Sequence, residues 1–336
     1  MTSSALAHPN VPLRIAADGM GGDLAPDQVV LGAAAAARDL GVEVVVVGLP
    51  DRVQRLLDPH PQLRFVPASQ VIEMHEHPAQ AVRSKTDSSM SVCARLCKQG
   101  EAAAWVSAGN SGAILAAALF LQGRVRGVER PALGTVLPTA GPPAYFLDVG
   151  ANVDSRPEFL VQFAQMGVVY AERVLGRENP VVGLLSNGEE EGKGSELVKE
   201  VGGRLRRTSL NFMGNVEPKD VLAGRADVVV ADGFVGNVAI KMAEATAELV
   251  FRTLRDEVPR TLHGKAGGLL IRPAVNRIRS RMDWREFGGA PLLGIEGVAV
   301  VAHGRSDALA VRNAIRVARQ AVESDLVGKI REALGK

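Results

Sequence analysis

The sequence predicts a three-layer α/β/α sandwich with a largely parallel sheet. Short apolar runs rich in β-branched residues alternate along the chain with longer stretches of 3.6-residue hydrophobic periodicity. Such alternation is typical of parallel strands joined by helices that cover both faces of the sheet. The sequence contains no internal repeat, low-complexity block or linker rich in Pro and Ser. We therefore expect one continuous domain over residues 13–336.

The expected elements follow in chain order. The runs predicted as buried strands are Leu13–Ala17, Glu43–Gly48, Ala104–Ser107, Tyr145–Val149, Val181–Leu185, Asp227–Ala231 and Val298–Ala302. The stretches predicted as helices are Asp27–Leu40, Ser88–Lys98, Gly112–Leu121, Pro157–Leu175, Glu196–Arg207, Gly236–Val258 and Ala308–Leu334. Residues 236–290 depart from the alternation, because a long helix is followed by a Gly-containing turn and another helix. We expect this segment to form a projecting helical hairpin.

Composition and charge exclude several protein classes. The 39 basic and 37 acidic residues give a net charge of +2, which does not suit a nucleic-acid-binding protein. The longest apolar run, Ala113–Leu121, is far shorter than the roughly 20 residues that a membrane-spanning helix needs. Residues 1–12 lack the basic and apolar regions of a signal peptide, so we expect a disordered leader on a cytoplasmic protein. Cys93 and Cys97 favour two reduced thiols over a redox pair.

Glycine-rich polar loops follow six of the predicted strands. They are Asp18–Asp23, Ser107–Gly112, Asp148–Asp154, Ser186–Gly194, Asp232–Asn237 and His303–Gly304. The carboxyl ends of parallel strands form the edge at which α/β proteins bind ligands. Glycine lets the backbone approach a ligand, and N–H groups at helix starts bind anions together with Asn and Ser. The pattern predicts an anion-binding rim, while ordinary turn chemistry is the alternative for each single loop.

Nucleotide and metal sites fit these loops poorly. The segment Gly188–Lys193 lacks the Gly-Lys-Ser/Thr ending of a P-loop, and the opening glycines do not have G-x-G-x-x-G spacing. Asp148, Asp154 and Asp232 are candidates for a metal-binding carboxylate cluster, but the histidines do not have the spacing of metal ligands. We expect neither a metal ion nor a cofactor.

Several long motifs, in order from about residue 13 to residue 325, carry a family resemblance. They are RIAADGMGGDLAP, AVRSKTDSSM, SAGNSGA, GRVRGVERPAL, LDVGANVD, GNVEPKD, ADVVVADGFVGN and AHGRSDA. In these motifs the chain closely resembles the bacterial acyl-carrier-protein-dependent phosphate acyltransferases of phospholipid synthesis. Two positions depart from the family pattern: Gly19 stands where Ala is usual, and Ser186-Asn187 where Asn and an aliphatic residue are usual. The second departure leaves the role of Asn187 open.

The resemblance implies an activity, a fold and partners. The activity is reversible transfer of a fatty acyl group from acyl-[acyl carrier protein] to inorganic phosphate, giving acyl phosphate that a membrane glycerol-3-phosphate acyltransferase consumes. The fold resembles that of the isocitrate/isopropylmalate dehydrogenases and the phosphotransacetylases. Family members are homodimers that associate peripherally with the membrane.

The chemistry requires little more than positioned cations and N–H groups. Phosphate is itself the nucleophile, and a thiolate leaves readily because the pKa of its thiol is about 8.5. The remaining task is to place phosphate and to stabilise the tetrahedral oxyanion. We expect Lys193 to contact the phosphate or the oxyanion, Asp232 to orient Lys193 or a substrate donor, and His303 to protonate the leaving thiol.

Each of these roles has a plainer alternative. The alternatives are a solvated lysine after three acidic residues for Lys193, a helix N-cap for Asp232 and a structural histidine for His303. We also expect Arg83 and Lys85 to add positive charge at the entry. The residues expected to bind phosphate or substrate are Asp18, Gly21, Gly22, Asp23, Gly109, Asn110, Ser111, Asn152, Asn187, Gly188 and Asn237.

Three other functions compete with this interpretation. The first is a phosphotransacetylase-like enzyme that uses coenzyme A, and the second is a non-catalytic scaffold at the membrane surface. The third is a nicotinamide oxidoreductase, which needs an acidic cofactor-binding residue that we cannot place after the first Gly-rich turn. Because neither cysteine belongs to the predicted rim, we expect direct transfer without an acyl-cysteine intermediate.

The expected hairpin concentrates positive charge. Between Arg260 and Arg285 there are seven basic residues and one acid, a local charge of +6. The residues expected to contact the membrane or the carrier protein are Leu269, Leu270, Ile271, Arg272 and Arg277. An apolar turn after Gly267-Gly268 that is surrounded by basic residues suits an anionic bilayer or the acidic acyl carrier protein. A dimer interface formed by the same apolar face is the alternative.

Overall fold

The computed structural model describes residues 13–335 and divides by its contacts into two compact units. Of the described residues, unit 1 contains 13–122 and 297–322, and unit 2 contains 123–296 and 323–335. The leader expected at residues 1–12 lies outside the described residues. The expectation of one continuous domain stays a prediction.

Unit 1 contains a fully parallel sheet of five strands in the order β3-β2-β1-β4-β11. The strands are β1 (Arg14–Asp18), β2 (Glu43–Gly48), β3 (Leu63–Pro67), β4 (Ala104–Ser107) and β11 (Val298–Val301). Because β1, β4 and β11 are adjacent and parallel, the loops that follow them leave the same edge of the sheet. This arrangement brings together three of the loops predicted from the sequence.

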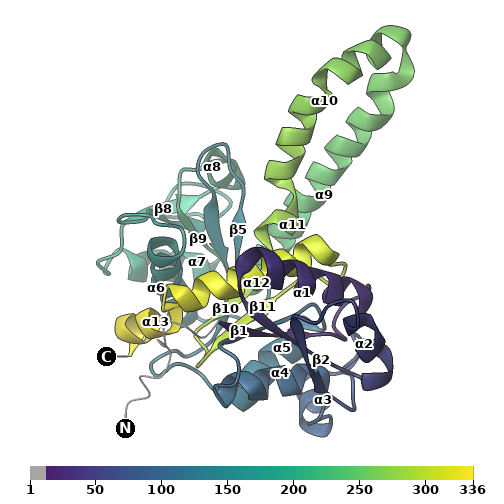
Figure 1. The fold of residues 1–336 in the computed structure, drawn as a ribbon. Coiled ribbons are helices and arrows are strands. Elements are labelled where there is room, and N and C mark those ends of the chain that lie inside the picture. Colours follow the sequence, from purple (N-terminus) through teal and green to yellow (C-terminus); the bar gives the residue numbers. More distant parts are fainter. Residues whose placement is uncertain (1–12, 336) are drawn as a thin grey trace. The chain divides into compact units, whose positions relative to one another are not determined.

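Helices cover both faces of the unit 1 sheet (Figure 1). They are α1 (Asp27–Leu40), α2 (Pro50–Leu57), α3 (Pro78–Ser84), α4 (Ser89–Lys98), α5 (Ser111–Ala117), the π-helix η1 (Ala118–Gln122) and α12 (Ala308–Glu323). Helix α1 packs closely on α12, since a Cβ on Gly32 would lie 2.6 Å from the Cβ of Val311. On β4, the indole of buried Trp105 donates to Gln122 Oε1 over 3.0 Å.

Unit 2 contains six strands in the order β10-β5-β6-β9-β7-β8. The strands are β5 (Ala132–Leu137), β6 (Ala144–Leu147), β7 (Val182–Leu185), β8 (Phe212–Val216), β9 (Val228–Val230) and β10 (Ala290–Leu293). Strand β5 runs antiparallel to β10 and β6, whereas β6, β9, β7 and β8 are parallel. The prediction of a mixed α/β fold with mostly parallel strands is confirmed in both units.

Alternate residues of β6 face different helix layers. Tyr145 stacks on Tyr170 of α6 with 3.8 Å between ring centroids, whereas Phe146 belongs to a core cluster with Val221 of α8 and, at its edge, Ile240 of α9. A strand that is apolar on both sides requires such double coverage. The helices of the unit are α6 (Pro157–Arg173), α7 (Glu196–Leu205), α8 (Pro218–Ala223), α9 (Gly233–Glu257), the 3-10 helix η2 (Val258–Arg260), α10 (Leu262–Met282), α11 (Trp284–Phe287) and α13 (Leu326–Leu334).

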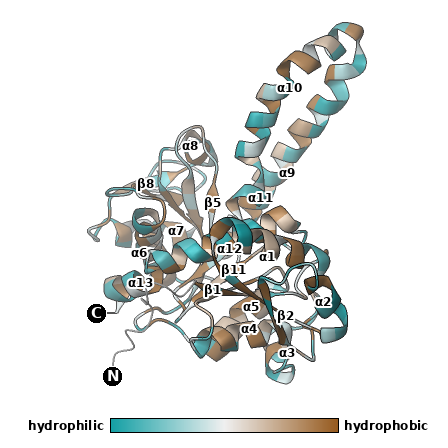
Figure 2. Cartoon of the chain, in the orientation of Figure 1, coloured by the Kyte–Doolittle hydropathy of each residue, from teal (hydrophilic) through white to brown (hydrophobic). Residues whose placement is uncertain are grey.

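Helices α9 and α10 form a long hairpin that extends away from the unit 2 sheet (Figure 1). Of α9 only Gly233 and Gly236 are buried, and along α10 no described residue is. Polar and apolar residues are interspersed along both helices (Figure 2). Within residues 13–335, no helix combines the length and the apolar character that a membrane span requires.

The position of the hairpin turn differs from the prediction. Gly267 and Gly268 lie inside α10, so the expected apolar turn at Gly267–Ile271 is wrong. The chain turns at η2 instead, where Pro259 lacks an N–H and Thr261 caps α10 by accepting from Gly264 N at 2.9 Å. Glycine in a helix interior costs only about 1 kcal/mol relative to Ala, which flanking helix formers offset.

Other boundaries differ for local reasons. The single helix expected over Ala308–Leu334 is two helices, because Asp325 has a left-handed backbone with φ of 50° between α12 and α13. The expected helix Gly112–Leu121 is α5 continued by the π-helix η1. The sequence did not indicate β3, β5, β8, β10, α2, α3 or α8. It also did not indicate that α10 begins before its glycines.

Two helical glycines provide a matched test of how α9 is packed. A Cβ on Gly236 would lie 2.0 Å from the carbonyl oxygen of Asp148, whereas a Cβ on Gly203 in α7 would meet no atom within 4 Å. We expect Gly236→Ala to lower the free energy of unfolding by about 2 kcal/mol through overpacking. Gly203→Ala should raise it by about 0.5–1 kcal/mol. Urea unfolding measures both, and equal effects would contradict the close approach.

Candidate functional site

A buried carboxylate organises the strand-end loops of unit 1. Asp18, the last residue of β1, is 3% exposed, and its Oδ2 accepts from Ser107 Oγ at 2.7 Å. Its Oδ1 accepts from Met20 N at 3.1 Å, and Ser107 Oγ in turn accepts from Gly109 N at 3.1 Å. Burial raises the pKa of Asp18, while hydrogen bonds from Ser107 and Ser89 lower it. The loops after β1 and β4 are thereby joined.

Glycine backbones bring the predicted phosphate-binding loops into close contact. A Cβ on Gly21 would lie 2.8 Å from Gly109 N, and a Cβ on Gly22 would lie 3.0 Å from Gly304 O. Gly22 also has φ of 103°, a conformation that L side chains rarely adopt. Asp23 N donates to Gly304 O at 2.7 Å, so the loop after β11 joins the same cluster.

The remaining predicted residues of unit 1 are placed differently. The amide of Asn110 donates to Met74 O and Glu76 O at 3.1 Å each, and its Oδ1 caps α5 by accepting from Ala113 N at 3.2 Å. The side-chain NH₂ group of Asn110 is therefore already hydrogen-bonded within the protein. Ser111 is exposed at the start of α5. His303 is exposed as well, and its Nδ1 accepts from Arg305 N at 3.3 Å, which leaves Nε2 as the N–H of the neutral ring.

The two basic side chains expected at the entry of the site, Arg83 and Lys85, already have partners within the protein. Lys85 Nζ donates to Val71 O at 2.7 Å and to Glu76 Oε2 at 2.6 Å. The guanidinium of Arg83 lies 4.8 Å from the ring centroid of Phe120. Lys85 therefore anchors the chain between β3 and α3, which the sequence did not indicate.

Unit 2 contains a second buried strand-end carboxylate. Asp148 follows β6, is 0% exposed and accepts five hydrogen bonds from N–H groups. The donors are Leu133 N, Gly150 N, Ala151 N, Asn152 N and Asn152 Nδ2, at 2.7–3.2 Å. Burial raises the pKa of Asp148, while these hydrogen bonds lower it. Asn152 also donates to Pro131 O at 2.8 Å, so its amide holds the loop together.

The start of α9 lies directly against this loop. Gly233 N donates to Asn152 O at 2.9 Å, and a Cβ on Gly150 would lie 2.5 Å from Asn237 Nδ2. Asp232 caps the helix, since its Oδ1 accepts from Phe234 N at 3.1 Å and from Val235 N at 3.0 Å. The structure thus brings together the predicted residues Asn152, Asp232 and Asn237.

The loop between β7 and α7 carries the predicted cation. Lys193 is exposed, and its Cγ lies 2.7 Å from the position of a Cβ on Gly188. Asn187 Oδ1 accepts from Gly194 N at 2.9 Å and closes the loop. Within residues 13–335 no hydrogen bond or ion pair joins Lys193 to Asp232. The carboxylate of Asp232 thus makes the hydrogen bonds of a helix N-cap, which was the alternative to its expected role in orienting Lys193.

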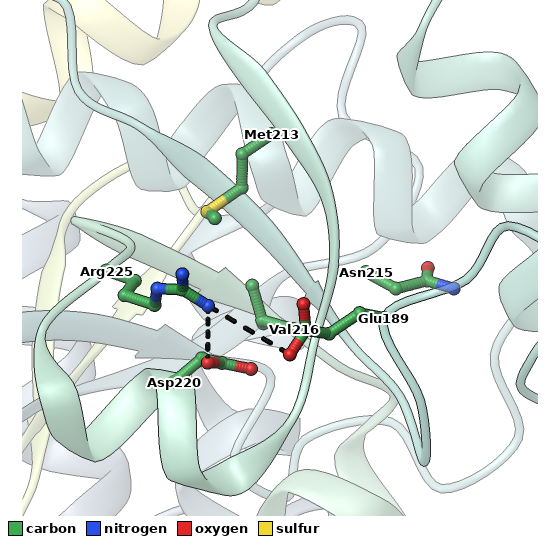
Figure 3. A pocket seen from close by; sticks show the side chains of 6 residues that line it. All are labelled: Glu189, Met213, Asn215, Val216, Asp220 and Arg225. Atoms are coloured by element: carbon green, nitrogen blue, oxygen red, sulfur yellow. Dashed lines mark hydrogen bonds and ion pairs between the residues drawn. The ribbon is translucent and has the colours of Figure 1, made fainter.

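A cavity of about 350 Å³ lies beside β8 and α8 in unit 2 (Figure 3). Arg225 there forms ion pairs with Asp220 at 2.8 Å and with Glu189 at 4.0 Å. Glu189, Glu217 and Asp220 are close enough to hold a cation, but Lys219 and Arg225 neutralise them. None of these residues was predicted as a site residue.

The two cysteines of α4 lack the properties of a nucleophile. Cys93 is buried, and desolvation raises its pKa well above the ordinary value. Burial raises the pKa of Cys97 to about 11. Both therefore remain thiols at neutral pH, and a thiolate is the reactive form.

Comparisons with known proteins agree over nearly the whole chain. Residues 13–329 match the family described as fatty acid synthesis protein. A phosphate acyltransferase from a Cyanothece species is 50% identical over 323 residues, which cover 94% of each chain. One from Desulfitobacterium hafniense is 48% identical, with 96% of this chain and 97% of the relative covered.

Solved structures support the fold at low sequence identity. A phosphotransacetylase from Streptococcus pyogenes has a TM-score of 0.64 at 18% identity, over 93% of this chain and 94% of the other. A 4-hydroxythreonine-4-phosphate dehydrogenase from Klebsiella pneumoniae has a TM-score of 0.53 at 15% identity, over 93% and 98% of the two chains. At these identities the likeness concerns the fold alone.

Two aspartates test the role of the buried carboxylate in unit 2. Asp148→Asn replaces one acceptor oxygen by an NH₂ group that faces N–H donors, so we expect the free energy of unfolding to fall by about 2 kcal/mol. The matched change Asp154→Asn, at an exposed position of the same loop, should alter it by less than about 0.5 kcal/mol. Thermal unfolding at neutral pH measures both; a neutral Asp148→Asn would show that the five hydrogen bonds do not hold the loop.

Proposed function

Because the chain belongs to the phosphate acyltransferase family, we propose that it transfers a fatty acyl group reversibly from acyl-[acyl carrier protein] to inorganic phosphate. The product is acyl phosphate for phospholipid synthesis. The observation that carries the proposal is identity of about one half to named phosphate acyltransferases over nearly the full length. In each unit, glycine-rich loops at the strand ends are of the kind that binds anions, which supports the proposal.

Phosphate is the nucleophile in this reaction. One of its oxygens attacks the thioester carbonyl carbon, the C–S bond breaks, and the carrier-protein thiolate leaves and takes up a proton. The backbones of Gly21, Gly22 and Gly109 pack closely at the strand ends of unit 1, and phosphate would bind at the edge of this glycine cluster. Asp23, Asn110 and Ser111 border these glycines, and Asp18 holds the loops in place. The high pKa of Cys97 supports transfer without a covalent enzyme intermediate.

The three proposed catalytic residues have separate tasks. The exposed ammonium of Lys193 contacts the phosphate or the developing oxyanion, next to Asn187 and Gly188. Asp232 orients a substrate donor from the first turn of α9, beside Asn152 and Asn237. His303 protonates the leaving thiolate from Nε2 when both of its ring nitrogens carry protons, a state in which Nδ1 no longer accepts from Arg305 N.

A comparison of donors tests the proposal against its nearest alternative. Purified protein is incubated with inorganic phosphate and either palmitoyl-[acyl carrier protein] or palmitoyl-coenzyme A, and acyl phosphate is trapped as hydroxamate. We expect the carrier-protein donor to react faster. Preference for coenzyme A would favour the phosphotransacetylase-like enzyme, whose relatives share this fold. Absence of acyl phosphate with both donors would favour a scaffold or another chemistry.

We also propose that the fold is a sandwich of the isocitrate/isopropylmalate dehydrogenase type, which the likeness to phosphotransacetylase and to 4-hydroxythreonine-4-phosphate dehydrogenase supports. We further propose a cytoplasmic homodimer that associates peripherally with an anionic membrane. There it delivers acyl phosphate to a membrane glycerol-3-phosphate acyltransferase.

The hairpin supports these partner proposals through its exposed apolar residues. Leu269 is 69% exposed and Leu270 83%, and Arg272 and Arg277 lie further along α10. Exposed apolar residues in such number indicate an interaction surface. The other large apolar residues exposed on α9 and α10 are Phe234, Val235, Val238, Met242, Leu249, Val250, Leu254, Leu262, Ile271, Ile278 and Met282. The basic segment around α10 suits an anionic lipid surface or the acidic acyl carrier protein.

The cation of the β7–α7 loop is tested by one pair of variants. We expect Lys193→Ala to lower kcat/KM about 100-fold, the effect of removing one group that stabilises an oxyanion. Its exposure means that the fold survives, which circular dichroism verifies. Lys199→Ala on α7, which loses only an exposed ion pair with Glu196, should retain activity within about twofold. Near-wild-type rates for Lys193→Ala would remove Lys193 from the mechanism.

The membrane contact is tested by flotation with anionic liposomes. Changing Leu269 and Leu270 to Glu should abolish flotation, because apolar burial is lost and charge repulsion is added. The control changes Asn276 and Ser280, both exposed on α10, to Glu and should keep most of the binding. Light scattering and the soluble assay should show an unchanged dimer and unchanged turnover. A monomeric Leu269/Leu270 variant would indicate that these leucines belong to the dimer interface instead.

A further inference from the structure

A methionine lies next to the glycine-rich loops at the strand ends of unit 1 (Asp18–Asp23, Ser107–Gly112 and His303–Gly304), here called the unit 1 rim. Met74, in the chain between β3 and α3, is 53% exposed. Its Cε lies 3.6 Å from the position of a Cβ on Gly304, and Asp23 Oδ2 lies 3.7 Å from the same point. Met74 is therefore next to two strand-end loops that contribute to the proposed phosphate site. No motif in the sequence indicated this position.

Hydrogen bonds on both sides hold Met74 in place. Lys85 Nζ binds Val71 O at 2.7 Å and Glu76 Oε2 at 2.6 Å. Asn110 Nδ2 donates to the carbonyl oxygen of Met74 itself and to that of Glu76, both at 3.1 Å. Glu73 N donates to Glu76 Oε2 at 2.7 Å. The loop has no regular secondary structure, yet its carbonyls are fixed before, at and after Met74.

The charge that anchors the loop persists at neutral pH. The hydrogen bond from Lys85 holds the pKa of Glu76 below its ordinary value, so this carboxylate stays ionised. Asn110, which fixes Met74, also caps α5 in the loop after β4. A single exposed apolar side chain needs no functional explanation in general. Here, however, its backbone is bonded directly to a residue of the glycine-rich rim.

We propose that Met74 determines specificity for the acyl group by contacting the alkyl chain beside the reacting thioester. This inference rests on the proposed function, because an acyl substrate must occupy the rim. In the unit 1 loops Asp18–Asp23, Ser107–Gly112 and His303–Gly304, the apolar side chains Met20 and Ala108 are buried. The surface that these loops expose consists of glycine backbone and polar side chains, so Met74 beside them offers an alkyl chain the apolar contact that they lack. The thioether of Met74 is flexible and polarisable, and such side chains adapt to flexible apolar ligands.

The test compares chain lengths with one donor type. Wild type, Met74→Ala and Met74→Leu are assayed with butyryl-, octanoyl- and palmitoyl-[acyl carrier protein] and inorganic phosphate. We expect Met74→Ala to lower the preference for palmitoyl over butyryl about fivefold, mainly through KM, because apolar contact area is lost. KM for phosphate should stay within about twofold, and Met74→Leu should restore the preference. Leu31→Ala, at a 47% exposed leucine of α1, is the matched control and should leave the preference unchanged.

The outcomes separate this inference from the proposed function. An unchanged chain-length preference in Met74→Ala, with active wild type, overturns the role of Met74 alone. The same holds if activity falls equally with all three donors or if KM for phosphate rises, since both results indicate a displaced loop. Wild type that forms no acyl phosphate from any donor overturns the proposed function and the inference together.

Discussion

A buried carboxylate at the end of a strand is the constraint on which both loop systems depend. Asp148 in unit 2 satisfies five N–H donors, and Asp18 in unit 1 joins two loops through Ser107. Loops rich in glycine have few side chains of their own with which to pair their backbone, so an internal acceptor replaces them. Desolvation of these carboxylates is costly, and the hydrogen bonds offset that cost only while the loops keep their geometry.

The absence of a side chain at the loop glycines is as important for the packing of these loops as the buried carboxylates are. In both units a Cβ at several glycines would meet backbone atoms of the next loop, as at Gly21 against Gly109 and at Gly233 against Asn152. The loops therefore approach one another at backbone distance, which a side chain at these positions would prevent. In unit 2 the same contacts fix the first turn of α9, so the hairpin begins at the candidate site.

The sequence predicted the buried parallel strands well, because continuous apolar runs such as Glu43–Gly48 and Ala104–Ser107 have few alternatives. It did not predict β5, whose antiparallel pairing with β6 and β10 depends on distant partners. The strand-end loops were located correctly, whereas the expected tasks of their side chains stay predictions. The hydrogen bond from the Asn110 amide to Met74 O has no signal in local sequence.

The hairpin contributes almost nothing to the interior of the protein, since no described residue of α10 is buried. Substitutions there meet little resistance from folding stability, because surface changes away from packed features alter it by only about 0.5 kcal/mol. The core tolerates far less, as the helix root at Gly233 and Gly236 illustrates. Folding stability therefore places few constraints on the sequence between these glycines and Trp284, and what constrains it is mainly whatever the hairpin touches.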